Sequence, residues 1–314
     1  MHALLDGATA GDPMCAVKWT RKSTRVVARF LRVSPSKAWR MLRKEKYRLR
    51  FNRKRLYRKT HPERDRQFRY INRLRRDFKK SGDPVISVDA KKRELVGLFR
   101  NGGRAWRQDA IDVSVYDFPS DAQGVAIPYG IYDDGRGDGF VVVGTSHNTA
   151  EFATHAIRTW WMDVGRKQYQ KSKRLLILAD SGSSNAARAT AWKQGLQTLA
   201  DKFGLNITVA HYPTGASKWN PVEHRLFGPI SINWSGQPLK DYSTILGHIR
   251  QTRTTSGRKC RARIDRQHWP TKSELEAAGK STRLNSPLRI CHARVLSDLN
   301  YTVLSSLCRR RCPT

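Results

Sequence analysis

The segment RLLILADSGSSN, residues 174–185, decides the fold of this 314-residue chain. Its apolar run ends abruptly at Asp180, and the turn-forming sequence Ser-Gly-Ser-Ser follows. A short apolar run closed by a turn is typical of a strand that is buried on both faces of a sheet. Open α/β folds keep their chemistry where such strands end, so Asp180 is a candidate catalytic residue. The alternative is that Asp180 only caps the helix expected from about Ser184.

The segments on either side of this strand alternate between strand and helix patterns. We expect strands at 85–88, 124–132 and 139–144 and a helix at 150–164, followed after the central strand by a helix at 185–203, a strand at 206–211 and a helix from about 220. The extended run at 94–100 is interpreted as part of an insertion. This order predicts an α/β fold with a ribonuclease-H-like mixed sheet and flanking helices.

Two further carboxylates belong to the same edge of this predicted sheet. Asp89 ends the first strand, and Glu223 lies in the helix after the fifth strand. In the ribonuclease-H-like arrangement the first and fourth strands are neighbours, and that helix passes over their ends, so Asp89, Asp180 and Glu223 should meet. Each also has a simpler alternative role, because Asp89 suits a turn, Asp180 a cap, and Glu223 a capping box with Asn220.

Three carboxylates at one point need a positive counter-charge. Oxygen ligands with open positions suit Mg²⁺ or Mn²⁺, and two such ions about 3.5–4 Å apart form a clamp for in-line attack on a phosphodiester. We therefore expect two divalent cations, with Asp89 bridging both ions and with Asp180 and Glu223 each holding one. One ion would activate a water or a 3′-hydroxyl, and the other would stabilise the leaving oxygen.

The sequence GASKWN, residues 215–220, stands just before Glu223. Lys218 is expected to hold a phosphate and Trp219 to stack on a base, while a core contact is an equally simple role for Trp219. The acidic turn at 133–138 resembles a calcium loop. It lacks the spaced ligands and the closing Glu of such a loop, so we interpret it as a hairpin turn.

The composition points to a polyanionic partner. The chain has 60 Lys+Arg against 26 Asp+Glu, a net charge of +34, together with 39% hydrophobic residues, which is enough for an ordinary core. Nucleic acid is the leading partner for such a charge. No apolar stretch approaches the roughly 18–20 residues of a membrane span, so no membrane partner is expected. The five cysteines are scattered and odd in number, which argues against a disulfide framework and favours a reduced, cytoplasmic protein.

The N-terminal part carries a helix-turn-helix pattern, an all-α DNA-binding region before the sheet. Ser34 suits an N-cap and Pro35 the first turn of a second helix. Two apolar stripes are expected to face inward: Val26, Val27, Phe30 and Leu31, then Ala38, Trp39, Met41 and Leu42. The second helix of this motif enters the major groove, so four side chains should face the bases: Ser36, Lys37, Arg40 and Arg43. The alternative is a small helical hairpin with a solvated basic face.

Positive charge is densest between the two predicted regions. Residues 40–80 contain 19 Lys/Arg and 4 Asp/Glu. Residues 65–80 are expected to form one helix with a single apolar face of Phe68, Ile71, Leu74 and Phe78. The predicted organisation is a disordered lead-in at 1–18, the helix-turn-helix region at 19–60, a basic linker helix at 61–83, the catalytic domain at 84–255 and a basic C-terminal region at 256–314.

Several long motifs resemble one known family. PVISVDAKKRELVGLFRNGGRAWR, AIPYGIYD, LILADSGSSNAAR and GASKWNPVEHRLF are similar to motifs of the Rhodopirellula-type DDE transposases of the ISAzo insertion-sequence family. The similarity runs from about Trp19 to Val303. It implies that Asp89, Asp180 and Glu223 are the DDE triad, that the fold is ribonuclease-H-like, and that the activity is DNA cleavage and strand transfer.

The sequence therefore predicts a cation-dependent insertion-sequence transposase that binds the terminal inverted repeats of its element. Its partners would be double-stranded DNA, as element ends and target, and a second copy of the chain in a dimer or higher synaptic complex. Two alternatives stay open. One is a nuclease of the same fold that hydrolyses DNA without joining it, and the other is a DNA-binding relic whose triad no longer works.

Overall fold

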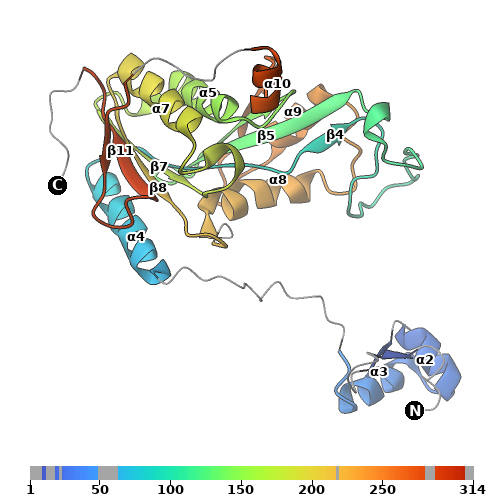
Figure 1. Ribbon diagram of the computed structural model, residues 1–314. Coiled ribbons are helices and arrows are strands. Elements are labelled where there is room, and N and C mark those ends of the chain that lie inside the picture. Colours follow the sequence, from blue (N-terminus) through green and yellow to red (C-terminus); the bar gives the residue numbers. More distant parts are fainter. Residues whose placement is uncertain are drawn as a thin grey trace. The chain divides into compact units, whose positions relative to one another are not determined.

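The computed structural model describes residues 9–11, 18–20, 23–48, 63–216, 219–279 and 287–307. The chain divides into two compact units, Met1–Tyr57 and Arg58–Thr314, each of which is described by itself. Figure 1 labels their helices and strands.

The described residues of the first unit form two helices joined by a tight turn. Helix α2 (Thr24–Leu31) is capped by Ser23, and α3 (Pro35–Lys44) is capped by Ser34, whose hydroxyl accepts a hydrogen bond from the Lys37 N–H. The expected cap and first-turn proline are thus confirmed. Short strands β1 (Thr9–Gly11) and β2 (Lys18–Thr20) pair in an antiparallel hairpin, so the expectation of a disordered lead-in does not hold for these residues.

The core of this unit is smaller than the two predicted stripes. Val27, Ala28 and Ala38 are buried, whereas Phe30 is 54% and Trp39 is 51% exposed. The prediction that Phe30 and Trp39 face inward is therefore wrong. The Arg43 guanidinium lies over the Trp39 ring, 5.0 Å from its centroid, which explains how an exposed indole is partly covered.

The second unit is built on one mixed sheet of nine strands. Its order is β10-β11-β8-β7-β3-β5-β6-β9, and β4 pairs with β5 off this path. β3 is parallel to β7 and antiparallel to β5, and β7 is parallel to β8. The strands are β3 (Val85–Ala90), β4 (Glu94–Val96), β5 (Gly124–Asp133), β6 (Gly139–Gly144), β7 (Arg174–Ala179), β8 (Asn206–His211), β9 (Arg261–Asp265), β10 (Ile290–His292) and β11 (Asn300–Val303).

Helices cover both faces of this sheet (Figure 1). On one face lie α5 (Ala150–Trp160), its π-helical continuation η3 (Trp161–Gly165), α6 (Arg166–Gln168) and α7 (Thr190–Phe203). On the other lie α4 (Arg64–Lys80), the π-helical turn η6 (Glu223–Phe227), α8 (Gly228–Asn233) and α9 (Tyr242–Gln251). Short turns η2 (Pro119–Asp121) and η4 (Ser183–Asn185) and helix α10 (Lys272–Ala277) complete the unit.

Strand β7 is buried on both faces, as its sequence predicts. Leu175 and Ile177 pack into the core beneath α5 and α7, whereas Leu176 and Leu178 pack into the core beneath α4. Alternate side chains of a strand point to opposite faces, so a continuous apolar run fits only between two helical layers. The ribonuclease-H-like α/β sheet with flanking helices is thereby confirmed.

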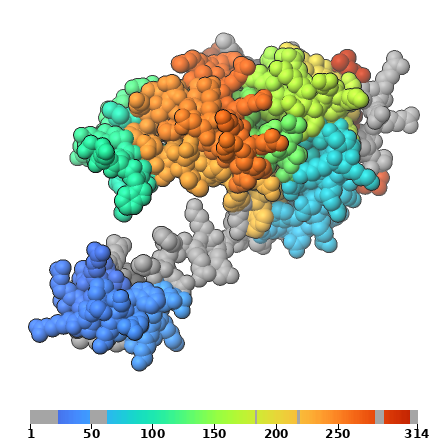
Figure 2. Space-filling model, turned by 180° about the vertical axis from the view of Figure 1, so that it is seen from behind, coloured from blue at the N-terminus to red at the C-terminus, as the bar shows by residue number. Residues whose placement is uncertain are grey.

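Helix α4 belongs to the second unit and packs on its sheet. Ile71 and Phe78 are buried, as the predicted apolar face requires. Gln67 is also fully buried, because its amide exchanges hydrogen bonds with Asn300 of β11 and donates to the His211 carbonyl of β8 at 2.8 Å. In the space-filling view α4 (cyan) forms a continuous part of the surface (Figure 2).

The C-terminal part differs most from the expectation of a separate basic region at 256–314. Strands β9, β10 and β11 from this part complete both ends of the sheet. They are short, with three to five residues each, and polar or charged residues interrupt their apolar positions, so no apolar run marked them. Cys260 is buried with a free thiol, whereas Cys291 is disulfide-bonded. The expectation of a fully reduced chain is therefore wrong at Cys291, because the spacing of cysteines in the sequence does not show which thiols meet.

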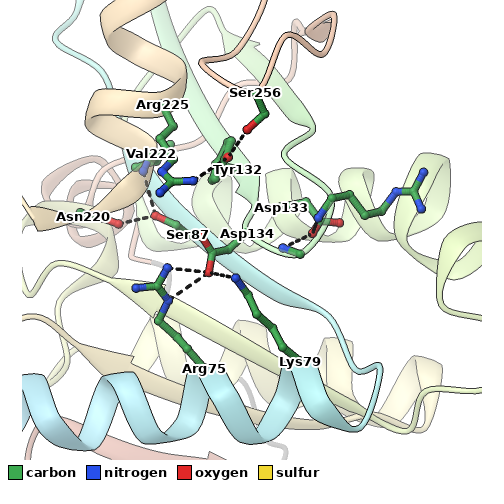
Figure 3. A network of polar contacts seen from close by, with 12 residues as sticks. Arg75, Lys79, Ser87, Tyr132, Asp133, Asp134, Asn220, Val222, Arg225 and Ser256 are labelled. Carbon is green, nitrogen blue, oxygen red and sulfur yellow. Dashed lines mark hydrogen bonds and ion pairs between the residues drawn. The ribbon is translucent and has the colours of Figure 1, made fainter.

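The acidic turn between β5 and β6 is a hairpin turn, as predicted. Asp133 Oδ1 accepts hydrogen bonds from the Gly135 and Arg136 N–H groups, and Asp134 is bound by Arg75 and Lys79 of α4 (Figure 3). The acidic side chains therefore fasten the turn to α4. Among the described residues, no helix is both long and apolar enough to span a bilayer.

Candidate active site

Strand register places the first two acidic residues side by side. In the parallel pair of β3 and β7, Val88 is aligned with Ala179, so Asp89 and Asp180 each follow at the next position of neighbouring strands. Asp89 is 8% exposed, and its carboxylate accepts a hydrogen bond of 2.7 Å from the Ala90 N–H. Asp180 directly follows β7 and accepts a hydrogen bond from the Gly182 N–H.

A buried polar contact docks the third acidic residue against β3. The Ser87 hydroxyl donates to the Asn220 side-chain oxygen Oδ1 and accepts a hydrogen bond of 3.0 Å from the Val222 N–H. The Asn220 amide donates to the Val88 carbonyl at 3.1 Å. Figure 3 shows this contact at the start of η6, whose first residue is Glu223. Two segments far apart in sequence are thereby held together beside Asp89.

Close packing over β5 completes this placement. Gly130 is paired with Asp89 in the antiparallel register of β3 and β5. A Cβ atom on Gly130 would lie 2.5 Å from the Phe227 ring and 3.1 Å from a Val222 methyl group. The η6 turn therefore lies directly against the backbone opposite Asp89, which only glycine permits at this distance.

The electrostatics confirm that the three carboxylates share one environment. The pKa of Asp89 is raised to about 8, mainly by burial and with the neighbouring charges of Asp180 and Glu223 acting in the same direction, against the opposing effect of the Ala90 N–H. Burial also raises the pKa of Asp180, opposed by the Gly182 N–H and reinforced by Glu223. The structure thus brings together Asp89, Asp180 and Glu223 as predicted.

This cluster fits hard divalent cations. Carboxylate oxygens are the ligands that Mg²⁺ and Mn²⁺ prefer, and a bound cation would supply the counter-charge that the crowded carboxylates lack. Lys92 and Arg93 follow Asp89 closely and are exposed, and they line a cavity of about 360 Å³ with Lys91 and His147. A phosphate that approaches the triad would therefore meet positive charge.

The other predicted site residues have different outcomes. On α3, all four predicted groove-facing side chains are exposed: Ser36, Lys37, Arg40 and Arg43. Lys218 lies outside the described residues. Trp219 is 44% exposed, its ring contacts Phe68 edge-on, and the Arg64 guanidinium lies 4.7 Å from its centroid. Trp219 therefore combines a packing contact with α4 and an exposed portion.

Sequence reasoning missed several residues that position the triad. Besides Ser87, Asn220 and Gly130, these include His211, whose Nδ1 donates to the Asp180 carbonyl, and Tyr129, whose hydroxyl donates to the Asn185 side chain at 2.7 Å. Their contacts join residues that are distant in sequence. The one available signal was the position of Asn220 just before the helix that carries Glu223.

The chain thus has a ribonuclease-H-like mixed sheet with three carboxylates at one edge. The family profile described as Rhodopirellula transposase DDE domain matches residues 1–304, and the chain belongs to this family of DDE transposases. The predicted resemblance is confirmed.

Two solved structures are similar to the chain. The chain is similar to "Mos1 transposase paired-end complex with left transposon end", with 14% identity over 78% of this chain and 67% of that chain and a TM-score of 0.45. It is also similar to "Crystal structure of the mariner Mos1 paired end complex with Mg", with 15% identity over 78% and 67% of the two chains and a TM-score of 0.46. A comparison with curated proteins finds no match.

Proposed function

We propose that this transposase binds the terminal inverted repeats of its element and catalyses divalent-metal-dependent DNA cleavage and strand transfer. The observation that carries the proposal is the convergence of Asp89, Asp180 and Glu223 at one edge of the sheet. Membership of the DDE transposase family supports it independently.

In this proposal the three carboxylates are the catalytic residues and the metal ligands. Asp89 would contact both cations, while Asp180 and Glu223 would each hold one. When bound, two cations supply activation of the attacking oxygen and stabilisation of the leaving oxygen. In this proposal the chain holds the three carboxylates at one edge of the sheet through strand register and through the Ser87–Asn220 contact.

DNA recognition is divided between the two units. The exposed face of α3 would read base edges through Ser36, Lys37, Arg40 and Arg43, because a second helix of this motif fits the major groove. Lys218 and Trp219 would contact the DNA end. Two ends must be processed together, so we propose a homodimer or higher synaptic complex.

Cleavage of DNA that carries the element's ends tests this proposal. We expect Asp180→Asn to lower the rate of metal-dependent cleavage at least about 100-fold, because it removes a proposed metal ligand. Substitution of a residue that only supports a metal ligand has a smaller effect. DNA affinity should be unchanged. Asp121→Asn, which alters an exposed carboxyl group in η2, is the matched control and should retain full activity.

The products distinguish the alternatives. Joined products in Mg²⁺ or Mn²⁺ support strand transfer, whereas hydrolysis without joining would identify a nuclease of the same fold. Salt-sensitive DNA binding with no cleavage by the unaltered chain would contradict an active transposase and leave a DNA-binding relic.

A further inference from the structure

Two imidazoles and a carboxylate converge outside the acidic triad. His147 Nε2 lies 3.4 Å from Glu274 Oε1, and His268 Nε2 lies 3.8 Å from Glu274 Oε2. One ligand atom from each of the three residues lies within 4.8 Å of the other two, and no other set of three His, Cys, Asp or Glu residues among the described residues meets this criterion. These separations resemble those between neighbouring ligands of one metal ion, since Zn²⁺ lies about 2.0–2.2 Å from nitrogen and oxygen ligands.

The backbone around the two histidines is fixed by hydrogen bonds. His147 lies in the loop between β6 and α5, and His268 lies between β9 and α10. The Ser146 hydroxyl donates to the Gln267 carbonyl at 3.1 Å and accepts a hydrogen bond of 3.0 Å from the Trp269 N–H. The residue before His147 is thus bound to both neighbours of His268, so the two imidazoles are brought together before any ion binds.

Glu274 is oriented by the start of α10. Its Oε2 accepts hydrogen bonds of 2.6 Å from the Thr271 N–H and 3.0 Å from the Thr271 hydroxyl. The Glu274 N–H donates in return to the Thr271 hydroxyl at 3.3 Å, which completes a capping box. The two hydrogen bonds from Thr271 hold the pKa of Glu274 below its usual range, so this carboxyl group is ionised at neutral pH. Both of these hydrogen bonds go to Oε2, so Oε1 stays available to a cation.

The donor set differs from that of the acidic triad. Two imidazole nitrogens with one carboxylate oxygen suit Zn²⁺ and related transition ions, whereas Mg²⁺ prefers oxygen ligands alone. Three protein ligands leave at least one coordination position for water or an anion.

We propose that His147, His268 and Glu274 form a binding site for one transition-metal ion of the Zn²⁺ class. The ion fastens the β9–α10 segment to the loop that precedes α5. His147 also lines the cavity that contains Lys92 and Arg93. The proposal stands on these three residues and does not depend on the proposed function.

Metal titration of the full chain tests the site. Excess Mg²⁺ and the background substitutions Asp89→Asn and Asp180→Asn keep Zn²⁺ from the triad. We expect one equivalent of Zn²⁺ to bind, and each of His147→Ala, His268→Ala and Glu274→Gln to weaken its affinity at least about tenfold. Glu274→Gln keeps the capping box, because Gln serves the same position, so α10 should still form.

The control variant is His292→Ala, which removes an exposed histidine of β10 and should bind Zn²⁺ as tightly as the background protein. A second measurement uses Co²⁺, whose visible d–d absorption should appear in the background protein and disappear in the three ligand variants. Absence of Zn²⁺ binding, equal affinity in the ligand variants, or a thiolate-to-cobalt band from cysteine ligands would each overturn the proposal.

Discussion

At the scale of single residues, His211 couples the interior of the sheet to the edge that carries Asp180. Its ring is fully buried, Nδ1 donates to the Asp180 carbonyl at 2.9 Å, and Nε2 has no hydrogen-bond partner among the described residues. Burial lowers the pKa of His211 to about 4, with the nearby charge of Lys193 acting in the same direction against the Asp180 carbonyl. A second proton on this ring would place an uncompensated charge in the core.

Folding stability should therefore depend on pH through His211. A histidine in the unfolded chain has a pKa near 6.5. Between pH 6.5 and about 4 the unfolded chain therefore binds a proton at His211 that the folded chain does not bind. The stabilisation is complete above pH 6.5 and is lost as the pH falls through 4. Between pH 6.5 and 4 the unaltered protein should lose about 3 kcal/mol of unfolding free energy through His211. We expect His211→Asn, whose side-chain amide can still donate to the Asp180 carbonyl, not to show this loss.

Urea denaturation of both proteins at a series of pH values measures this difference. Titration of Asp89 and other groups affects both proteins alike and cancels in the comparison. Parallel pH dependence of the two unfolding free energies would show that His211 does not carry the effect.

At the scale of elements, the position of η6 over β5 sets the position of Glu223. Gly130→Ala would place a Cβ atom 2.5 Å from the Phe227 ring, so η6 must shift. We expect a loss of about 1–3 kcal/mol in stability from overpacking and a fall in cleavage rate on the order of 100-fold, because Glu223 moves away from Asp89. DNA affinity should not change.

Single-turnover cleavage and denaturation measure the two effects of this substitution. Gly247→Ala in α9 is the matched control, since its added Cβ would meet no atom within 4 Å. It should leave cleavage unchanged and stabilise the helix by about 0.5–1 kcal/mol. Full cleavage activity in Gly130→Ala would show that the packing of η6 does not affect catalysis.

At the scale of the whole molecule, a net charge of +34 is concentrated enough to form a defined surface. An open groove of about 750 Å³ lies along α4, the cyan helix of Figure 2, and is lined by basic side chains and Tyr70. Arg75 and Lys79 are already paired with Asp134, so they serve the fold. We therefore expect Arg69, Arg73 and Arg76 to contact DNA phosphates.

Salt dependence of DNA binding tests this surface. Each phosphate contact contributes about 0.9 to the slope of log K against log salt concentration, so replacing these three arginines by Gln should lower the slope by up to about 3 for all sequences alike. The control replaces Lys167, Lys171 and Lys202, which are exposed on or near α6 and α7, on the other face of the sheet. An equal change of slope in both variants would mean that charge alone, and not α4, determines binding.

The sequence by itself determined the order of the elements and the residues that end them. The apolar run before Asp180, the Ser34-Pro35 start of α3 and the spacing of Ile71 and Phe78 are local patterns, and local propensity and burial periodicity produce them. The candidate triad followed because this order of strands and helices implies one topology, and the motifs resemble one family.

Only the tertiary structure decided which distant residues meet. The alignment of Val88 with Ala179, the Ser87–Asn220 contact and the fit of Gly130 against Phe227 depend on register and packing between segments far apart in sequence. For the same reason the short strands β9 to β11 joined the sheet unpredicted, because their place depends on partners and not on their own apolar content.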